Sequence, residues 1–413
     1  MDMQSKAKKL IEMIQTAPVE WKPLGEVGLL VRGNGLQKKD FTESGVPAIH
    51  YGQIYTYYGN QTDKTLSFVS PELAEKLKKV DKGDVVITNT SENIEDIGKA
   101  LLYLGEEQAV TGGHTTIFKP SKEIVGKFFV YFTQTEIFDK AKRKFAKGTK
   151  VIDVSATDMA KIKIPIPPLE NQKKIVKILD KFTELEATLE AELALRKRQY
   201  RYYRDFLLDF DNQIGGMADG YQCRLKDVVW KTLGEVAEYS KNRICSDKLN
   251  EHNYVGVDNL LQNREGKKLS GYVPSEGKMT EYIVNDILIG NIRPYLKKIW
   301  QADCTGGTNG DVLVIRITDE KVNPKYLYQV LADDKFFAFN MKHAKGAKMP
   351  RGSKTAIMQY KIPIPPLPEQ EKIVAILDKF DTLTHSVSEG LPHEIALRRK
   401  QYEYYREQLL AFR

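Results

Sequence analysis

The chain has 413 residues and a formal net charge of +8 at pH 7, which favours a polyanionic partner over a neutral one. It contains no long apolar run and no signal peptide, and its three cysteines (Cys223, Cys245 and Cys304) form neither a CxxC motif nor an even framework. These features exclude a membrane-spanning protein and argue against a disulfide-stapled or zinc-bound fold. We therefore expect a cytoplasmic protein of about two to four domains.

The chain consists of two similar halves. Each half opens on a WKxLGEV motif, at Trp21–Val27 and at Trp230–Val236, and a long segment that differs almost completely between the halves follows. Internal repeats of this kind indicate one structural unit present twice. A chain with two similar halves usually meets an approximately two-fold partner, and duplex DNA is the commonest such object.

The two variable segments are predicted to be mixed α and β. Val85–Thr88 and Ile287–Ile289 are short β-branched runs that follow tight turns, as strands do. Residues 123–138 and 324–339 are rich in aromatic residues and each predicts one helix. Each segment is long enough to bury a core of its own.

A KIPIPPL element closes each variable segment, at Lys163–Leu169 and at Lys361–Leu367. Its prolines forbid helix and hold the chain extended. From Leu169 to about Leu208 the sequence predicts one long helix, because apolar residues recur at three-and-four spacing and no Gly or Pro interrupts them. The two copies continue to match through Phe182 and Phe380.

The second copy predicts a broken helix. Pro368 suits the first helical position, and the apolar stripe runs on to Val387. Gly390 and Pro392 then predict a break before the helix resumes to Leu410. A rod this long with one apolar stripe needs a partner helix, so we expect the two copies to form an antiparallel pair; the alternative is that each helix caps only its own domain.

Both helices end on a basic, tyrosine-rich block, ALRKRQYRYYR at 194–204 and ALRRKQYEYYR at 396–406. Arginine and lysine could contact DNA phosphates there. Alternatively, the tyrosines pack against a partner protein, and we favour this second interpretation because a repeated element implies a repeated partner surface. The candidate partner-binding residues are Arg196, Arg198, Tyr200, Tyr203, Arg398, Tyr402 and Tyr405.

Two basic loops close the variable segments, at 140–150 and 342–354, and their cations are expected to lack acidic neighbours. Base reading further requires polar side chains on exposed turns. In the first half the candidate DNA-binding residues are Gln53, Tyr55, Tyr57, Tyr58, Lys142, Arg143, Lys144, Lys147 and Lys150. In the second half they are Asn291, Arg293, Tyr295, Lys297, Lys342, Lys345, Lys348 and Arg351.

No catalytic motif withstands inspection. Residues 346–355 (GAKMPRGSKT) resemble a phosphate loop, but they carry an internal proline and do not follow a strand, so Ser353, like Ser155 in the first half, is better interpreted as a helix cap. There is no methyl-donor motif, no nucleophile with a matching base and no metal-ligand cluster. The sequence therefore predicts a protein that is not an enzyme.

Taken together, the two proline elements followed by ENQKKIVKILDKF and PEQEKIVAILDKF, the tyrosine-rich helix ends and the two WKxLGEV openings resemble the specificity subunits of type I DNA restriction and modification systems. The resemblance covers the whole chain. The usual EQ pair after the prolines is kept at Glu369 and Gln370, whereas the first copy has Asn171 and Gln172.

The resemblance implies an α+β protein with two globular mixed α/β target recognition domains, held apart by long conserved helices that form an antiparallel, pseudo-two-fold coiled coil. Each domain would read one half of a bipartite, asymmetric site on double-stranded DNA. The implied organisation is a first recognition domain at 1–160, a helical spacer at 161–210, a linker at 211–227, a second recognition domain at 228–358 and a C-terminal helical spacer at 359–413.

The resemblance also implies partners. Two methyltransferase subunits would bind this chain, and restriction subunits would bind through them. The chain itself would hold no cofactor, since S-adenosylmethionine, ATP and Mg²⁺ belong to the partner subunits. A stand-alone DNA-binding regulator without a methyltransferase is the alternative, which an adjacent methyltransferase gene would exclude; an orphan nuclease or ATPase is a third hypothesis, and the missing motifs argue against it.

Overall fold

The computed structural model describes residues 17–210, 227–386 and 388–412, together with residues 5, 9, 11 and 12. The chain divides into two compact units: unit 1 comprises Met1–Thr188 and Ile395–Arg413, and unit 2 comprises Leu189–Glu394. The predicted linker at 211–227, except Asp227, lies outside the described residues, as do Cys223 and Val387.

Unit 1 contains one sheet of five strands, one of four and two of two strands each. The five-stranded sheet has the order β2 (Gly28–Arg32), β11 (Thr115–Pro120), β7 (Val85–Thr88), β9 (Ala100–Tyr103) and β4 (Gln61–Thr62). The four-stranded sheet has the order β5 (Ser67–Val69), β3 (Val46–Ile49), β10 (Ala109–Thr111) and β6 (Lys78–Val80). The short strands β8 (Thr90–Ser91) and β12 (Ile152–Asp153) pair with each other. Its short helices are α2 (Tyr51–Thr56), α3 (Pro71–Lys76), α4 (Gly126–Phe132), α5 (Glu136–Arg143) and α6 (Ala156–Met159).

Unit 2 has a smaller version of this arrangement. Its four-stranded sheet has the order β15 (Ala237–Tyr239), β21 (Val312–Ile317), β18 (Ile287–Gly290) and β19 (Ile299–Gln301). A three-stranded sheet has the order β16 (Arg243–Cys245), β17 (Lys278–Tyr282) and β20 (Gly306–Thr308). Its helices before the second proline element are α8 (Leu233–Val236), α9 (Pro324–Leu331), α10 (Asp334–Lys342) and α11 (Lys354–Met358).

The two repeated sequence motifs of each half pair with each other. β1 (Glu20–Pro23) runs antiparallel to β13 (Lys163–Ile166), so that Trp21 lies opposite Pro165. In the second half β14 (Val229–Thr232) pairs in the same way with β22 (Lys361–Ile364), and Trp230 lies opposite Pro363. Each ribbon has only two strands, so its prolines interrupt no inner ladder. The start and the end of each variable segment are thereby tied together.

A buried glutamine joins each ribbon to the helix that follows. Gln172 is fully buried, its Oε1 accepts a hydrogen bond from Val125 N (2.8 Å), and its Nε2 donates to the carbonyls of Glu123 (2.9 Å) and Pro167 (2.8 Å). Gln370 makes the equivalent three bonds. The glutamine shared by the NQ and EQ pairs is therefore a structural residue.

The long helices follow the predicted bounds. α7 spans Leu169–Leu207, α12 spans Leu367–His385 and α13 spans Gly390–Leu410, so the predicted break at Gly390 is confirmed. The left-handed backbone of Gly390 (φ +72°) explains why glycine stands at this break.

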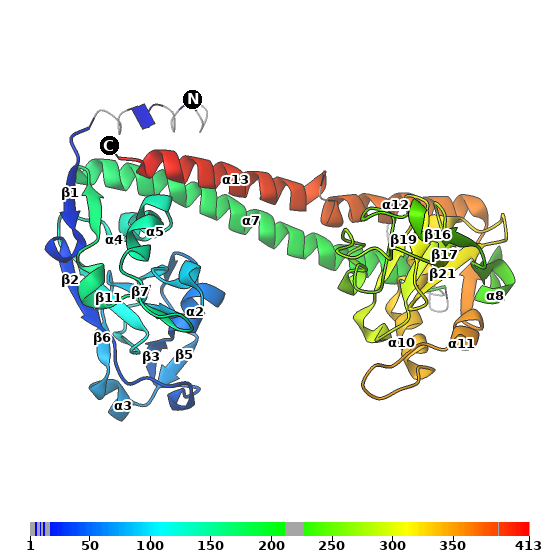
Figure 1. Cartoon of the computed structure of the whole chain (residues 1–413), viewed down its shortest axis with the longest axis horizontal. Coiled ribbons are helices and arrows are strands. Elements are labelled where there is room, and N and C mark those ends of the chain that lie inside the picture. Colours follow the sequence, from blue (N-terminus) through cyan, green and yellow to red (C-terminus); the bar gives the residue numbers. More distant parts are fainter. Residues whose placement is uncertain are drawn as a thin grey trace. The chain divides into compact units, whose positions relative to one another are not determined.

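Each unit contains an antiparallel helix pair. In unit 1, α13 lies beside the first part of α7, with Glu186 and Arg399 joined at 2.5 Å and the rings of Phe182 and Tyr405 stacked at 5.4 Å (Figure 1). In unit 2, the last part of α7 packs on α12, and Tyr203 stacks on Phe380 at 5.3 Å. α7 thus contributes to both cores, and the alternative in which each helix caps only its own domain is wrong.

Two predicted helices are each divided in the structure. Residues 123–138 contain α4 and the start of α5, and 324–339 contain α9 and part of α10. The second helix of each pair begins at a side-chain cap, because Thr135 accepts from Phe138 N and Asp333 accepts from Lys335 N. A hydrophobic pattern carries no mark of such a break, whereas the caps at Ser155 and Ser353 are confirmed.

Candidate nucleic-acid interface

Each unit closes its variable segment with the same small loop. In unit 1 the backbones of Lys147 and Asp153 exchange two hydrogen bonds of 3.0 and 2.8 Å, and in unit 2 Lys345 and Arg351 do the same at 2.9 and 2.8 Å. Both loops turn at a glycine with a left-handed backbone, Gly148 in one and Gly346 in the other. The two loops that were predicted as basic loops therefore have the same backbone structure.

A second, strained loop lies against the basic loop of unit 2. Gly352 N donates to Asn291 O (3.1 Å) and Arg293 N donates to Pro350 O (2.8 Å), so the segment 291–297 and the basic loop form one surface. Arg293 precedes a proline and has φ +53°, a conformation that costs a non-glycine residue about 1–2 kcal/mol. Such strain persists only where the surroundings hold it. The exposed side chains of Arg293 and Tyr295 are thereby presented on a rigid support.

Several loop cations have acidic neighbours, which corrects the expectation that they have none. Arg143 bonds Asp139 (2.6 Å) and Glu95 (3.0 Å), Lys147 bonds Asp158 (2.9 Å), and Arg351 bonds Asp311 (2.6 Å). Lys161 and Lys147 hold the pKa of the Asp158 carboxyl well below its usual range. Among the candidate DNA-binding residues, the exposed cations that form no ion pair with any described residue are Lys144, Lys150, Arg293, Lys342, Lys345 and Lys348.

Two candidate DNA-binding residues are buried, so neither can reach a DNA surface. Lys142 is 5% exposed; its ammonium donates to Ile97 O (2.6 Å) and pairs with Asp139 (3.0 Å), and burial lowers its pKa. Asn291 is also 5% exposed. Both are structural residues, which corrects the sequence prediction for them.

The four candidates around α2 have different roles. Gln53 donates to Ser67 Oγ (2.7 Å) and its Oε1 accepts from His50 N (3.3 Å). Tyr58 accepts from Leu66 N (2.8 Å), and burial raises the pKa of both Tyr58 and Tyr55. Tyr57, by contrast, is 67% exposed. Among these four, Tyr57 is therefore the residue that the fold leaves most available for contact.

A buried asparagine supports the loop in each unit, and the sequence prediction missed the one in unit 1, Asn89, while it named Asn291 as a DNA contact. Asn89 follows β7 as Asn291 follows β18, both are buried, and their carbonyls accept from Val154 N (2.9 Å) and Gly352 N (3.1 Å). Both asparagines could have been found from the sequence, because each directly follows the matching strand: Asn89 after Thr88 and Asn291 after Gly290. The segments that appear unrelated in sequence thus share one loop support.

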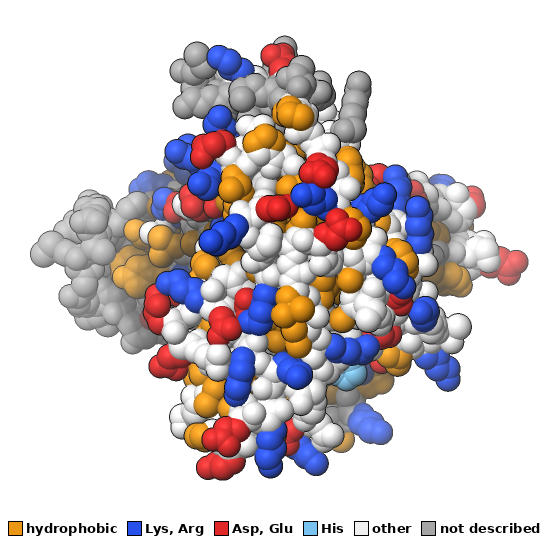
Figure 2. Space-filling view, turned by 90° about the vertical axis from the view of Figure 1, so that its left-hand side faces the viewer, with side chains coloured by type: hydrophobic (Ala, Val, Ile, Leu, Met, Phe, Trp, Pro, Cys, Tyr) orange, Lys and Arg blue, Asp and Glu red, His pale blue; other side chains and the backbone are white. Residues whose placement is uncertain are grey.

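The same support carries opposite charges in the two units. Asp153 in unit 1 occupies the position of Arg351 in unit 2, because each is the loop residue whose backbone pairs with the matching lysine. Asp153 binds Arg32 (2.7 Å), whereas Arg351 binds Asp311 (2.6 Å). The face of unit 1 in Figure 2 likewise shows Lys and Arg interspersed with Asp and Glu, without a field of a single sign. The two units therefore offer one backbone frame with different chemistry.

Three of the four candidate tyrosines, Tyr200, Tyr402 and Tyr405, are buried or half-buried, whereas Tyr203 is 41% exposed. Tyr200 is 8% exposed, and Tyr402 donates to Gln134 Oε1 (2.9 Å). Tyr203 and Tyr405 stack on Phe380 and Phe182. These tyrosines contact the other copy of the repeat within the same chain, so Tyr200 has no surface to offer a partner protein. The signal was present, since Tyr200 and Tyr203 extend the three-and-four spacing of the apolar stripe beyond Leu193.

The arginines of these ends are less uniform. Arg196 bonds Glu192 (2.7 Å) and Gln199 (2.9 Å), and Arg398 bonds Gln401 (3.0 Å). Arg198 is exposed. The exposed tyrosines of the two blocks are Tyr202 (62%), Tyr404 (60%) and Tyr203 (41%), and only Tyr203 belongs to the predicted candidates.

Within residues 17–210, 227–386 and 388–412, no group of three or more His, Cys, Asp or Glu side chains could hold a metal ion. No helix of this described part is long and apolar enough to cross a membrane.

Comparison with known proteins gives the family. The model of the type I restriction modification DNA specificity domain matches residues 18–195 and again 226–397. The chain belongs to the type I restriction-modification specificity subunits. The matched ranges coincide with the two repeats, so each repeat is one specificity domain. The chain is a non-catalytic subunit for DNA recognition.

Full-length relatives support this assignment. The specificity subunit of the type I restriction enzyme EcoR124I/EcoR124II from Escherichia coli is 30% identical over 430 residues, which covers 100% of this chain and 98% of the relative. A putative type I specificity subunit of Haemophilus influenzae is 28% identical over 99% of this chain and all of its own length.

Solved structures show the same fold. The S subunit of a type I system from M. genitalium has a TM-score of 0.55 at 15% identity and matches 96% of both chains. A structure that describes complex assembly and conformational transition of the type I restriction-modification system has a TM-score of 0.56 at 16% identity and matches 96% of this chain and 98% of its own. The predicted α+β fold with long conserved helices is thereby confirmed.

Proposed function

We propose that this specificity subunit recognises a bipartite, asymmetric site on double-stranded DNA, one half with each recognition domain. The proposed domains are residues 1–160 and 228–358, joined by the helical spacers 161–210 and 359–413 and the linker 211–227. The observation that carries the proposal is the repeated loop frame with inverted charge at Asp153 and Arg351. Two supports that are alike in backbone and unlike in side chains suit two half-sites of different sequence.

The proposed chemistry divides the loop residues by role. The exposed lysines of the two basic loops would neutralise backbone phosphates, which gives affinity without sequence information. Arg293, Tyr295 and Tyr57 are exposed and would contact base edges or sugars. Arginine is the usual reader of guanine, because its planar fork matches the O6 and N7 acceptors.

An exchange of one recognition domain tests the proposal. Replacing residues 19–160 with the corresponding segment of another specificity subunit is expected to change the bases of one half-site and leave the other half-site intact. The measurement is base-modification sequencing of DNA from cells that express the chain with a type I methyltransferase. If both half-sites change together, or neither does, the assignment of one half-site per domain is wrong.

We further propose that the helical spacers bind two methyltransferase subunits, and restriction subunits through them, in the cytoplasm. The support is a repeated outer stripe, Leu195, Arg198 and Tyr202 on α7 and Leu397, Lys400 and Tyr404 on α13. The two leucines are 47% and 46% exposed, so the two copies present the same surface. The three- and four-residue spacing places each triplet on one helix face. S-adenosylmethionine, ATP and Mg²⁺ would be held by the partner subunits.

Charged substitutions in the outer stripe are expected to reduce the number of bound methyltransferases. Leu195→Glu or Leu397→Glu alone should yield complexes with one methyltransferase, and the double variant should yield none, because a buried unpaired carboxylate weakens an interface by on the order of 100-fold. Native mass spectrometry reads the stoichiometry. Leu269→Glu, at another exposed leucine (55%), is the matched control. Two methyltransferases on the double variant would place docking elsewhere.

A further inference from the structure

Unit 2 contains a cationic cavity of about 430 Å³. Apart from Lys297, the residues that line it lie outside the loops of the candidate nucleic-acid interface. The cavity lies between the last turns of α7, the end of α12 and two loops that carry Arg264 and Lys297. Five cations line it: Lys197, Arg201, Arg204, Arg264 and Lys297. Three acidic residues line it as well: Glu265, Asp334 and Asp381.

The acids do not neutralise these cations. Asp334 is shared, because it accepts from Arg264 and also from Lys297 (2.8 Å). Arg201 and Lys197 form no ion pair with any described residue. Burial, and then the charge of Arg204, lowers the pKa of Arg264 to about 10, and burial followed by the charges of Arg264 and Arg204 lowers the pKa of Lys297. The cavity therefore concentrates positive charge without a matching anion.

Arg204 shows most directly that an acceptor is missing. The residue is 4% exposed, and its guanidinium carbon lies 5.8 Å from the centre of the Tyr200 ring. Its buried Nε has no hydrogen-bond partner among the described residues, and its nearest carboxylate, Asp205, is 3.7 Å away. A buried charged donor that is left unpaired destabilises the fold. An anion at the cavity would satisfy it.

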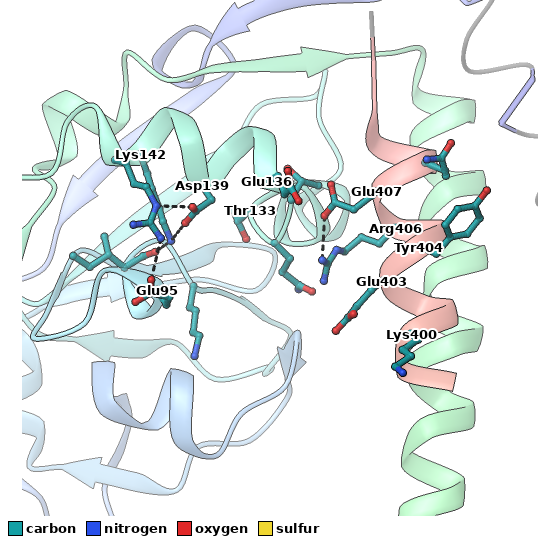
Figure 3. Close-up of a pocket in the computed structure, with 16 residues that line it drawn as sticks. Glu95, Thr133, Glu136, Asp139, Lys142, Lys400, Glu403, Tyr404, Arg406 and Glu407 are labelled. Atoms are coloured by element: carbon teal, nitrogen blue, oxygen red, sulfur yellow. Dashed lines mark hydrogen bonds and ion pairs between the residues drawn. The ribbon is translucent and has the colours of Figure 1, made fainter. Parts of the chain in front are cut away.

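Unit 1 contains a comparable pocket with balanced charge, of about 790 Å³ (Figure 3). Arg406 corresponds to Arg204 in the repeat, and its buried Nε likewise has no partner among the described residues. The two arginines differ in the adjacent carboxylate: Glu407 accepts from Arg406 at 3.1 Å, whereas Asp205 lies 3.7 Å from Arg204. Glu403 occupies the repeat position of Arg201. The cations Lys99, Lys142, Arg143, Lys400 and Arg406 thus face the acids Glu95, Glu136, Asp139, Glu403 and Glu407. The excess of cations is a property of unit 2 and not of the shared frame.

One chain segment links the cavity to the candidate nucleic-acid interface. Lys297 ends the strained segment 291–297, whose other end is bonded to the basic loop through Asn291 and Arg293. Lys297, Arg264 and Asn263 also have left-handed backbones (φ 50°, 67° and 54°), so the cavity rim is held in one conformation by its surroundings. An extended polyanion such as DNA could therefore contact both the loops and the cavity.

We propose that the unit 2 cavity binds one phosphate of the DNA backbone, with Arg201 and Arg204 as the main donors and Arg264 and Lys297 as supporting charges. Arginine forks match phosphate oxygens in a bidentate way. The contact would anchor the DNA beside the unit 2 half-site and add affinity without reading sequence. This inference rests on the proposed DNA-binding function.

Arg201→Glu tests the proposal, because it introduces at Arg201 the acid that the first pocket has at Glu403, and the exposed position lets the chain fold. DNA binding by the full chain should weaken about tenfold, and the slope of log Kd against log salt should fall by about 1. Lys379→Glu, an equal charge change at an exposed α12 residue outside the cavity, should weaken binding less than about threefold. Fluorescence anisotropy on a duplex carrying the mapped site measures both.

Neutral phosphates identify the contact directly. A series of duplexes is prepared in which each carries one methylphosphonate at a different position. At a single position, this change should weaken DNA binding by the wild-type chain and leave DNA binding by the Arg201→Glu variant unaffected. The inference would be overturned if Arg201→Glu and Lys379→Glu lost equal DNA affinity, or if the salt slope of Arg201→Glu were unchanged. It would also be overturned if Arg201→Glu bound DNA normally but lost a methyltransferase subunit, because the cavity would then bind an acidic protein segment. Absence of specific binding by the wild-type chain would instead refute the proposed function itself.

Discussion

Gln370→Ala is expected to lower the free energy of unfolding by about 3 kcal/mol, at roughly 1 kcal/mol for each hydrogen bond lost. Gln370 is fully buried, accepts from Asn323 N at 2.8 Å, and donates to the carbonyls of Lys321 (2.9 Å) and Pro365 (2.8 Å). Alanine would leave one backbone N–H and two carbonyls unpaired in the core, and a cavity would add to the cost. For a unit of this size the melting temperature should fall by about 6–12 °C.

A matched control separates this effect from the loss of any glutamine. Gln359 is exposed in the same unit and its side chain makes no hydrogen bond with the described residues, so Gln359→Ala should change the melting temperature by less than about 2 °C. Gln172→Ala should reproduce the Gln370→Ala loss in unit 1, where the same three bonds exist. Calorimetry measures all three variants. If the Gln370→Ala chain were as stable as the control, Gln370 would not stabilise the fold through these hydrogen bonds.

We expect the length of α7 to set the gap, the run of base pairs between the two half-sites that neither domain reads. Duplication of residues 188–191 (TLEA) within α7 should then lengthen this gap without altering either half-site. α7 begins in unit 1 and ends in unit 2, and the boundary between the units falls at Thr188 and Leu189. Four residues add about 6 Å of helix and about 40° of rotation. Since base pairs are spaced about 3.4 Å apart, the gap should grow by about one or two base pairs. Base-modification sequencing reads the gap and both half-sites at once.

The same four residues inserted beside Gly271 provide the control. Gly271 is exposed with open space around its Cα, and it lies outside the helices. This insertion should leave both the gap and the half-sites unchanged, because it does not lengthen α7. A TLEA duplication that altered bases inside a half-site while the gap kept its length would contradict the proposal that the helix sets the spacing.

The long helices could be predicted accurately because their signal is local. α7 has a continuous apolar spacing and no interrupting Gly or Pro. Gly390, whose left-handed backbone few other residues adopt, marks the break between α12 and α13 and is visible in the sequence. The division of residues 123–138 into α4 and α5 was missed, because the cap at Thr135 competes with helix continuation only when the surrounding chain turns there. Local patterns predict an element well and its interior breaks poorly.

The candidate site was predicted at the level of loops and missed at the level of side chains. The basic loops lie at the surface as expected, yet Lys142 is drawn into the core by Ile97, and Arg351 is paired with Asp311. These partners are distant in sequence, and no spacing rule links them. The exposure of Tyr57 and the burial of Tyr200 follow in the same way from tertiary neighbours.

The sequence by itself determined that the chain has two copies of one unit, that a proline element and a long helix close each copy, and that the family is one of DNA specificity. Local periodicity and proline geometry depend on neighbouring residues, and identity between the copies is found by comparing the two halves of the sequence, so none of these features requires tertiary contacts. Only the tertiary structure decided that Phe182 stacks on Tyr405 and Phe380 on Tyr203, so that each helix end packs on the other copy. It also decided that five cations meet in unit 2 where unit 1 is balanced, because burial and charge pairing depend on residues far apart in the chain.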